Sequence, residues 1–354
     1  MAGEIDFEKA KRVAQQIAGD VSTCVHGALS FIGDRLGLFK AMKAAGPVTS
    51  DELAVKTGLS ERYLREWLNA MAAAQYVAYD PPTRRYHLTP EYAMVLADEE
   101  SPFFAGSYFQ MAQGVMTVAP KVADSFRNGK GVAQSEYPPS MFEGSERNSF
   151  PRYKYKLIQK WIAALPEVVE RLNAGGTAVD VGCGGGRAAI LIAQAFPKAR
   201  VFGYDLVERS IERARLNAQS AEVADRVTFE ASNGATLPES KFDFVTTFDV
   251  VHDAVDPVGL MTAIRRALAP GGTYMVQEIN VSSKPEENHR PLGKMVYSIS
   301  TMYCMTTSLA HGGAGIGAAM GEVKARELAE QAGFTHFSRL PIEDDFAVLY
   351  ALKA

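Results

Sequence analysis

Residues 177–196, TAVDVGCGGGRAAILIAQAF, constrain the fold of this chain more than any other stretch. They begin as a β-branched run that ends in Asp180, break into glycines, and resume with apolar residues at helical spacing. This order predicts a strand, a tight turn and a helix. The turn carries three alternating glycines: Gly182, Gly184 and Gly186. The dinucleotide pattern G-x-G-x-x-G fails because Arg187 stands at its last glycine. The turn therefore either approaches a different nucleoside ligand or only packs a helix against a strand.

Strand-like and helix-like segments alternate from this stretch to the end of the chain. We predict strands at 177–182, 200–205, 227–230, 242–248, 273–278, 336–340 and 346–352, and helices at 188–196, 208–220, 257–268 and 322–332. This alternation predicts an α/β fold with a mostly parallel sheet, helices on both faces and an antiparallel last strand. Ligands of such sheets bind beyond the carboxyl ends of the strands. The residues expected there are Gly182, Asp205, Asn233, Asp249 and Glu278.

The N-terminal part has a different pattern. Between Asp6 and Ala45 apolar residues recur every three or four positions, which indicates one or two amphipathic helices. Residues 46–77 are typical of a helix-turn-helix with Ser50 and Ser60 as N-caps, and residues 77–89 predict the two short strands of a wing. We expect a helical and winged-helix domain at 1–100, a helical linker and pocket-lining segment at 101–170, and the sheet domain at 171–354. Within these parts, residues 137–151 are rich in turn formers and are expected to link the domains, whereas residues 153–176 and 295–312 are each expected to form a helix.

The charge of the chain argues against nucleic-acid and membrane partners. The net charge is −4, and in the expected recognition helix Arg62 and Arg65 are balanced by Glu61 and Glu66, whereas phosphate contacts need a basic surplus. The uncharged stretch 295–321 contains too many Ser, Thr and Gly residues for a membrane span. The N-terminus has acidic residues where a signal peptide needs basic and then apolar ones, so we expect a cytoplasmic protein.

The three cysteines argue against a disulfide framework and a metal site. Cys24, Cys183 and Cys304 are far apart in the sequence and have no metal-ligand spacing. We therefore expect neither a disulfide framework nor a metal site.

Five segments together carry a family resemblance. They are VDVGCGGG, FDVVHDAVDPVGL, LAPGGTYMVQE, PLGKMVYSISTMYCMTTSLA and EQAGFTHFSRL. With them the chain resembles the class I S-adenosylmethionine-dependent methyltransferases that carry an N-terminal winged helix, of the mycobacterial type. The resemblance implies a Rossmann-like sheet, S-adenosylmethionine as cofactor, a small-molecule methyl acceptor and a homodimer. It leaves the acceptor atom open.

The resemblance also assigns cofactor residues. The glycines of the turn would let the backbone approach the cofactor, and Asp205 would take the ribose hydroxyls. Asn233 stands where these enzymes more often place an acid near the adenine, so that position departs from the pattern. The full expected set is Asp180, Gly182, Gly184, Gly186, Asp205, Leu206, Asn233, Gly234, Phe248 and Asp249.

His252 is the candidate catalytic base. A His-Asp pair follows the fourth strand in small-molecule O-methyltransferases, and here it is His252 and Asp253. A neutral imidazole can take a proton from a hydroxyl as the methyl group transfers, and Asp253 or Asp256 would orient the ring. Ala254 replaces the Trp common in that pattern, and His252 as a loop cap or cofactor contact is the competing interpretation. We expect the substrate pocket to be lined by Phe142, Phe150, Tyr153, Glu278, Tyr297 and Tyr303.

Three functions are compatible with the sequence. The first is a methyltransferase acting on the oxygen, sulfur or nitrogen of a small molecule. The second has a thiol or sulfide as acceptor, which needs no base because a thiolate forms more readily than an alkoxide. The third is a winged-helix regulator that binds S-adenosylmethionine without catalysis.

Overall fold

The computed structural model describes residues 5–232, 234 and 236–354 and divides into two compact units. The first unit is Met1–Gly114 with Pro139–Pro151, and the second is Val115–Pro138 with Arg152–Ala354. The division of the sequence at residues 100 and 170 stays a prediction. No helix among the described residues is long and apolar enough to cross a membrane.

The first unit begins with the predicted helices and wing. Its first elements are α1 Phe7–Arg35, α2 Leu38–Ala45, α3 Ser50–Thr57, α4 Glu61–Ala73, β1 Ala78–Asp80 and β2 Arg85–His87. Thr49 caps α3 in a capping box with Glu52, so the prediction of Ser50 as N-cap was wrong by one residue. Ser60 is the N-cap of α4, as predicted. A buried cluster holds these elements together, with Phe39, Leu53 and Leu68 among its members.

Further helices complete or follow the first unit. They are α5 Pro90–Leu96, α6 Ser107–Met116, α7 Ala119–Asn128 and α8 Pro139–Arg152, with η1 Gln134–Glu136. We expected residues 137–151 to be a turn-rich link, but most of them form α8. Pro139 is the first residue of α8, where proline favours a helix start, and Pro151 lies in its last turn. In this unit the Arg147 guanidinium of α8 forms ion pairs with Asp34 of α1 at 2.7 Å and with Glu99 at 3.1 Å.

The second unit contains the predicted α/β sheet. Its strands are β3 Thr177–Val181, β4 Arg200–Asp205, β5 Val227–Ala231, β6 Phe242–Phe248, β7 Leu268–Ile279, β8 His336–Arg339 and β9 Ala347–Lys353. Their order across the seven-stranded sheet is β5-β4-β3-β6-β7-β9-β8. The neighbours from β5 to β7 pair in parallel, whereas β9 runs antiparallel to both β7 and β8. The predicted fold class is therefore confirmed, including the antiparallel last strand.

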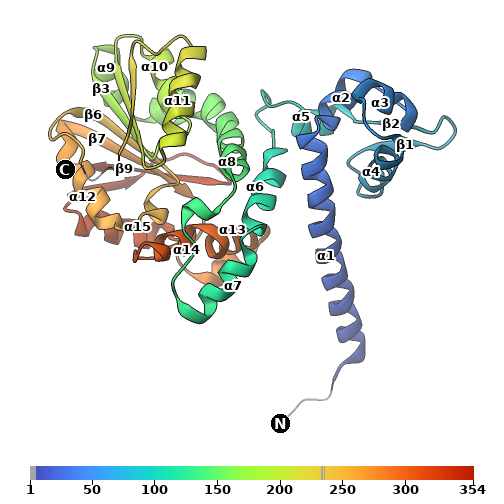
Figure 1. Ribbon diagram of the computed structural model, residues 1–354. Helices are drawn as coiled ribbons and strands as arrows, with labels where there is room; N and C mark the ends of the chain where they lie inside the picture. Colours follow the sequence, from blue (N-terminus) through green and yellow to red (C-terminus); the bar gives the residue numbers. More distant parts are fainter. Residues whose placement is uncertain (1–4, 233, 235) are drawn as a thin grey trace. The chain divides into compact units, whose positions relative to one another are not determined.

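Helices cover both faces of this sheet (Figure 1). On one face lie η2 Tyr153–Trp161, η3 Ile162–Ala164, α9 Pro166–Asn173, α10 Arg187–Ala195 and α11 Glu208–Ser220. On the other lie α12 Pro257–Ala267 and α15 Gly321–Gln331. We expected one helix before the first strand, but Pro166 divides it, because proline removes a backbone donor and favours a new helix start. Because β3, β4, β6 and β7 run parallel, their carboxyl ends lie at the same edge of the sheet.

The uncharged stretch is helical, as predicted. It forms α13 Pro291–Ile299, η6 Ser300–Cys304 and α14 Met305–Ala310, preceded by η4 Val251–Asp253 and η5 Pro285–Asn288 earlier in the chain. η6 is a π-helical turn within this helix, and such turns occur frequently at functional sites. The glycine-rich residues after α14 are tied down by hydrogen bonds, among them Ala314 N to Val255 O at 3.0 Å.

Candidate active site

The glycine turn after β3 is held by close packing on two sides. Gly182, Gly184 and Gly186 all have positive φ angles, of 75°, 51° and 73°. A Cβ at Gly182 would lie 2.5 Å from Val250, and one at Gly186 would lie 2.5 Å from Phe229. A Cβ at Gly184 would meet nothing within 4 Å. The outer glycines therefore allow the turn to pack, and the middle one faces open space where a ligand can approach.

Asp205 ends β4 next to this turn. Its Oδ2 accepts a hydrogen bond from Gly184 N at 2.8 Å, and its Oδ1 accepts one from Val207 N at 2.9 Å. Burial raises the pKa of the Asp205 carboxyl, although these backbone hydrogen bonds favour the charged form. Leu206, the next residue, is 68% exposed. The carboxylate is therefore fixed in orientation, and each oxygen keeps a lone pair for a ligand.

Asp180 is a buried acid in the middle of the sheet. The Thr246 hydroxyl of β6 donates a hydrogen bond of 2.9 Å to Asp180 Oδ1. Burial raises the pKa of Asp180 to about 7 despite this hydrogen bond, and the charge of Asp205 adds to the rise. The free protein thus has an acid at its centre that gives up its proton only near neutral pH.

Asp249, the residue after β6, has a strained backbone conformation. Asp249 has a φ of 55°, a left-handed conformation that costs free energy for a residue other than glycine. Its Oδ1 accepts a hydrogen bond from Gln277 Nε2 at 2.9 Å, and its Oδ2 lies 3.7 Å from Arg152 Nη2. These contacts hold the carboxylate in place at the edge of the sheet where Asp205 also lies.

Phe248 precedes this residue and is buried. Its ring lies 5.0 Å from the ring of Tyr153 and 6.0 Å from that of Trp161. The aromatic contacts fix the carboxyl end of β6 against η2. Whether Phe248 or Tyr153 touches a ligand stays a prediction.

His252 lies in η4 and is 2% exposed. Its Nδ1 forms a hydrogen bond with Glu278 Oε2, from the carboxyl end of β7, and its Nε2 lies 3.2 Å from Asp253 Oδ1. Burial alone would lower the pKa of His252, but the carboxylates of Glu278 and Asp253 raise it well above the ordinary value. Asp256 accepts a hydrogen bond from Gly259 N at the start of α12 instead. Of the two acids expected beside the ring, Asp253 is the one that contacts it, and its catalytic role stays a prediction.

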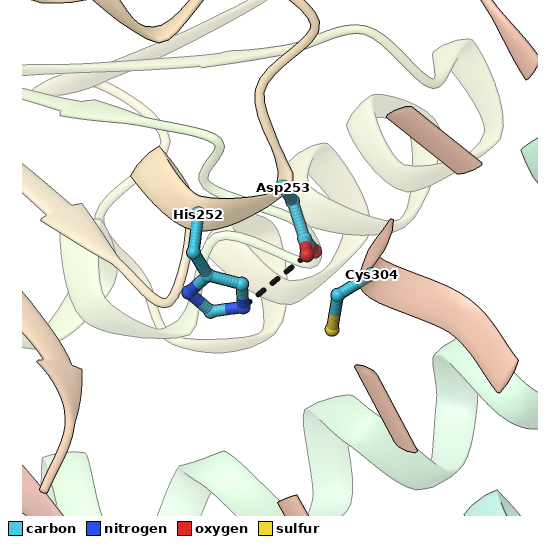
Figure 2. Close-up of side chains that lie close together, drawn as sticks. All are labelled: His252, Asp253 and Cys304. Carbon is cyan, nitrogen blue, oxygen red and sulfur yellow. Dashed lines mark ion pairs between the residues drawn. The ribbon is translucent and has the colours of Figure 1, made fainter. Parts of the chain in front are cut away.

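Cys304 completes a small cluster with His252 and Asp253. Figure 2 shows the imidazole and the carboxylate of η4 converging with the thiol of η6. One ligand atom from each of the three residues lies within 4.8 Å of the other two. Burial raises the pKa of the Cys304 thiol to about 12, and Asp253 contributes to this rise.

Two tyrosines lie beside this cluster. The Tyr303 hydroxyl accepts a hydrogen bond from Gln134 Nε2 at 2.8 Å, and the rings of Tyr303 and Tyr137 are 5.0 Å apart. Burial raises the pKa of Tyr303, and the charges of Asp253 and Asp205 raise it further, so Tyr303 lies within electrostatic reach of both carboxylates.

Within the second unit the structure brings several of the predicted residues together. Tyr297 is 39% exposed and accepts a hydrogen bond from Asn288 Nδ2 at 3.1 Å. Phe142 and Phe150 belong to α8 in the first unit. Gly234 has a φ of 66°, and a Cβ there would meet Val181 at 3.0 Å. The expected contact of Asn233 falls outside the described residues. The roles proposed for these residues stay predictions.

Several members of the site were not predicted from the sequence. Gln277 and Cys304 lie in segments that carry the family resemblance, but neither they nor Arg152 were assigned to the site, and Glu278 was assigned to the substrate pocket rather than to the His252 ring. The one available indication was the position of Glu278 at a strand end. Its partner lies 26 residues earlier in the chain, so no local spacing reveals the pair.

These features define a class of protein. A parallel sheet with a glycine turn after its central strand, an acid after the next strand and a winged helix before them is the architecture of class I methyltransferases with an N-terminal winged helix. Comparison with known families agrees. Residues 172–342 match the family described as "Methyltransferase domain", and residues 25–98 match the "Rv2258c-like winged HTH domain". The chain therefore contains a methyltransferase domain and a winged helix-turn-helix domain of these families.

Individual relatives match a shorter part of the chain. The chain is 32% identical over 139 residues to the 27-O-demethylrifamycin SV methyltransferase of Amycolatopsis mediterranei. The matched region covers 37% of this chain and 51% of that protein. It spans about half the length of the curated relatives that it matches.

Solved structures match over the whole chain. Mitomycin 7-O-methyltransferase has a TM-score of 0.70 at 17% identity and covers 98% of this chain and 100% of its own. Human N-acetylserotonin methyltransferase, in complex with S-adenosylmethionine, has a TM-score of 0.68 at 20% identity and covers both chains completely. At these identities the likeness shows the fold.

The buried acid gives a first prediction. Because the folded pKa of Asp180 is about 7 and the unfolded one about 3.8, the folded state holds a proton that the unfolded state releases between these pH values. Stability should therefore fall as pH rises through this window. We expect the difference in free energy of unfolding between wild type and Asp180→Asn to change by about 1.4 kcal/mol per pH unit from pH 4.5 to 6.5. Urea unfolding at several pH values measures it.

The difference should level off above about pH 7, where Asp180 is ionised in both states. A constant difference between the two proteins across the whole range would contradict the raised pKa.

Proposed function

We propose that this protein transfers a methyl group from S-adenosylmethionine to a small-molecule acceptor. The observation that carries the proposal is the glycine turn, where Gly184 faces open space while its N–H donates to the buried Asp205 carboxylate. When bound, S-adenosylmethionine supplies a methyl group on a positively charged sulfonium. The methyltransferase-domain match and the relatives named methyltransferases support the same activity.

The residues of the turn fit the nucleoside part of this cofactor. Asp205 is already oriented by Gly184 N and Val207 N, so accepting hydrogen bonds from two ribose hydroxyls costs little reorganisation. Side chains larger than hydrogen at Gly184 would intrude where the ligand approaches. We assign ribose binding to Asp205 and close backbone approach to Gly184.

Charged groups at the end of β6 fit the amino-acid part. Asp249 can pair with an ammonium group, and the Arg152 guanidinium at 3.7 Å from it can pair with a carboxylate. Gln277 keeps Asp249 in place by its hydrogen bond of 2.9 Å. The two charges thus match the opposite charges of an amino acid end.

His252 is the proton acceptor in this proposal. Glu278 accepts a hydrogen bond from Nδ1, so Nε2 is the nitrogen that can accept a proton once the imidazolium, which Glu278 and Asp253 stabilise, has given up its own. A hydroxyl acceptor that reaches Nε2 would pass its proton there as the methyl group transfers. Both carboxylates then stabilise the imidazolium. A thiol acceptor would not need this step.

The regulator alternative has less support. In α4, Arg62 pairs with Glu66 and Arg65 pairs with Glu61 at 3.0 Å. Arg85 of the wing is held by Glu52 at 2.7 Å. Phosphate contacts would have to compete with these carboxylates. We therefore keep the winged helix as a substrate-covering and dimerisation module.

The α1 helix supports the homodimer. It spans 29 residues, about 43 Å, and carries a row of exposed apolar side chains at helical spacing. The row consists of Val13, Ile17, Val21, Val25 and Ile32, each 42–61% exposed. A surface of this length is larger than the apolar patches normally left in water. We propose that a second copy of the chain covers it.

Cofactor binding gives the next prediction. Asp205→Ala removes the acceptor of the ribose hydroxyls and should weaken S-adenosylhomocysteine binding at least about tenfold, because hydrogen bonds to a charged group contribute about 1.5–3 kcal/mol. Isothermal calorimetry measures the affinity. Asp225→Ala, whose carboxylate is 70% exposed, is the matched control and should bind as wild type does. Equal affinities for all three proteins would refute the cofactor site.

Turnover tests the base. With a hydroxyl acceptor, His252→Ala should lower turnover by about 10²–10⁴-fold while calorimetry shows unchanged S-adenosylhomocysteine affinity. His336→Ala, an exposed histidine of β8, serves as the control. An acceptor screen that detects S-adenosylhomocysteine supplies the substrate. Undiminished turnover on a hydroxyl would remove His252 from the mechanism, and undiminished turnover on a thiol would favour the sulfur acceptor.

Oligomeric state tests the α1 surface. We expect the 38.4 kDa chain to sediment as a dimer and Val21→Lys to shift it toward the monomer, because a buried lysine opposes association. Val55→Lys changes an 86% exposed valine of α3 and should leave the dimer intact. Analytical ultracentrifugation distinguishes the forms, and a wild-type monomer at micromolar concentration would contradict the proposal.

A further inference from the structure

The cluster of His252, Asp253 and Cys304 has a geometry that acid–base chemistry alone does not require. His252 Nε2 lies 3.2 Å from Asp253 Oδ1, and one ligand atom of each residue lies within 4.8 Å of the others. Figure 2 shows that the three side chains, from η4 and η6, lie close together, with the thiol beside the His252–Asp253 ion pair. An imidazole, a carboxylate and a thiol therefore face one point.

The donor atoms suit a thiophilic divalent cation. Nitrogen, oxygen and sulfur together are the ligands that Zn²⁺ prefers, at about 2.0 Å for nitrogen and 2.3 Å for sulfur. Three protein ligands leave a fourth tetrahedral position open, as in zinc sites that exchange a bound molecule. The three ligand atoms lie up to 4.8 Å from one another. To coordinate one ion they would have to move closer together by roughly 1 Å.

The surroundings of His252 match those of a metal ligand. Glu278 bonds to Nδ1 on the far side of the ring, and such a carboxylate–histidine pair orients the other nitrogen toward a metal. Asp253 Oδ1 is buried and, apart from its ion pair with His252, has no hydrogen-bond partner among the described side chains and backbone. A cation at this point would satisfy that oxygen.

A second group of possible ligands lies on the other side of the ring. It consists of Asp249, His252 and Glu278. There Nδ1 and Glu278 are already joined by a proton, and Asp249 accepts from Gln277 at 2.9 Å. This group also lacks sulfur. The Nε2 side is therefore the better cation site.

We propose that His252 Nε2, Asp253 Oδ1 and Cys304 Sγ bind a thiophilic divalent cation such as Zn²⁺, with one coordination position open. Binding releases two protons to water, one from the Cys304 thiol and one from Nε2 of the His252 imidazolium. The ion takes the Nε2 lone pair, so His252 accepts no proton while the ion is bound. This consequence for the reaction rests on the proposed function, whereas binding itself does not.

The test uses the metal alone as the probe. In the full-length protein with Cys24→Ser, which removes the exposed thiol, we expect calorimetry to give one Zn²⁺ per chain with a Kd below about 1 μM. Cys304→Ser and Asp253→Asn in this background should each weaken binding about tenfold or more. Co²⁺ should show a thiolate-to-metal absorption band that Cys304→Ser abolishes. Cys183→Ser is the control for the other buried thiol and should change neither result.

Two outcomes would overturn the proposal. One is the absence of micromolar binding in the Cys24→Ser protein. The other is binding that Asp253→Asn and Cys304→Ser leave unchanged, including the case in which Asp249→Asn abolishes it. Asp253 is 29% exposed, so its variant should fold even where a change at buried Cys304 does not, and circular dichroism checks both.

The same samples separate this inference from the proposed function. S-adenosylhomocysteine binding without Zn²⁺ binding would refute the cation site and leave the methyltransferase proposal standing. Zn²⁺ binding without S-adenosylhomocysteine binding would refute the methyltransferase proposal and leave the cation site standing.

Discussion

The hydrogen bond from Gly184 N to Asp205 is the interaction on which the site depends. It joins the ends of two neighbouring parallel strands, β3 and β4, and it exists only because the turn after β3 adopts a left-handed backbone. The same turn packs against Val250 after β6 and Phe229 of β5 through glycines that leave no room for a side chain. One turn thus sets the relative positions of the ends of β3, β4 and β6 and packs against β5, and the polar residues at those ends are positioned with it.

The sequence predicted the strands and the glycine turn well, for physical reasons. The strands at 200–205 and 242–248 were predicted with the bounds of β4 and β6, because both are short runs rich in β-branched and aromatic residues and are bounded by charged or turn-forming residues. The turn and Asp205 were found because strand, glycines, helix and acid follow one another in the chain. Where the structural information is local in sequence, the pattern shows it.

The side-chain contacts around His252 were not predicted, because the residues that make them are far apart in the sequence. Glu278 meets His252 from a strand 26 residues later, and Cys304 meets it only after η6 returns to η4. Neither pairing leaves a spacing in the sequence. The helix over residues 139–152 was also missed, since its prolines lie at the ends, where a helix tolerates them, and not in its middle. Tertiary contacts decided each of these positions.

An excess of buried negative charge unites the two sides of the site. Burial raises the pKa of Asp180, Asp205 and Glu278, and repulsion from neighbouring carboxylates adds to the rise at Asp180 and Glu278. The carboxylates of Glu278 and Asp253 also raise the pKa of His252, so the imidazole holds its proton more firmly. A site with these properties gains free energy from any cation that enters it, because the cation lets the carboxylates ionise without mutual repulsion. A sulfonium cofactor, a proton on His252 and a divalent ion beside Cys304 all meet this one electrostatic requirement.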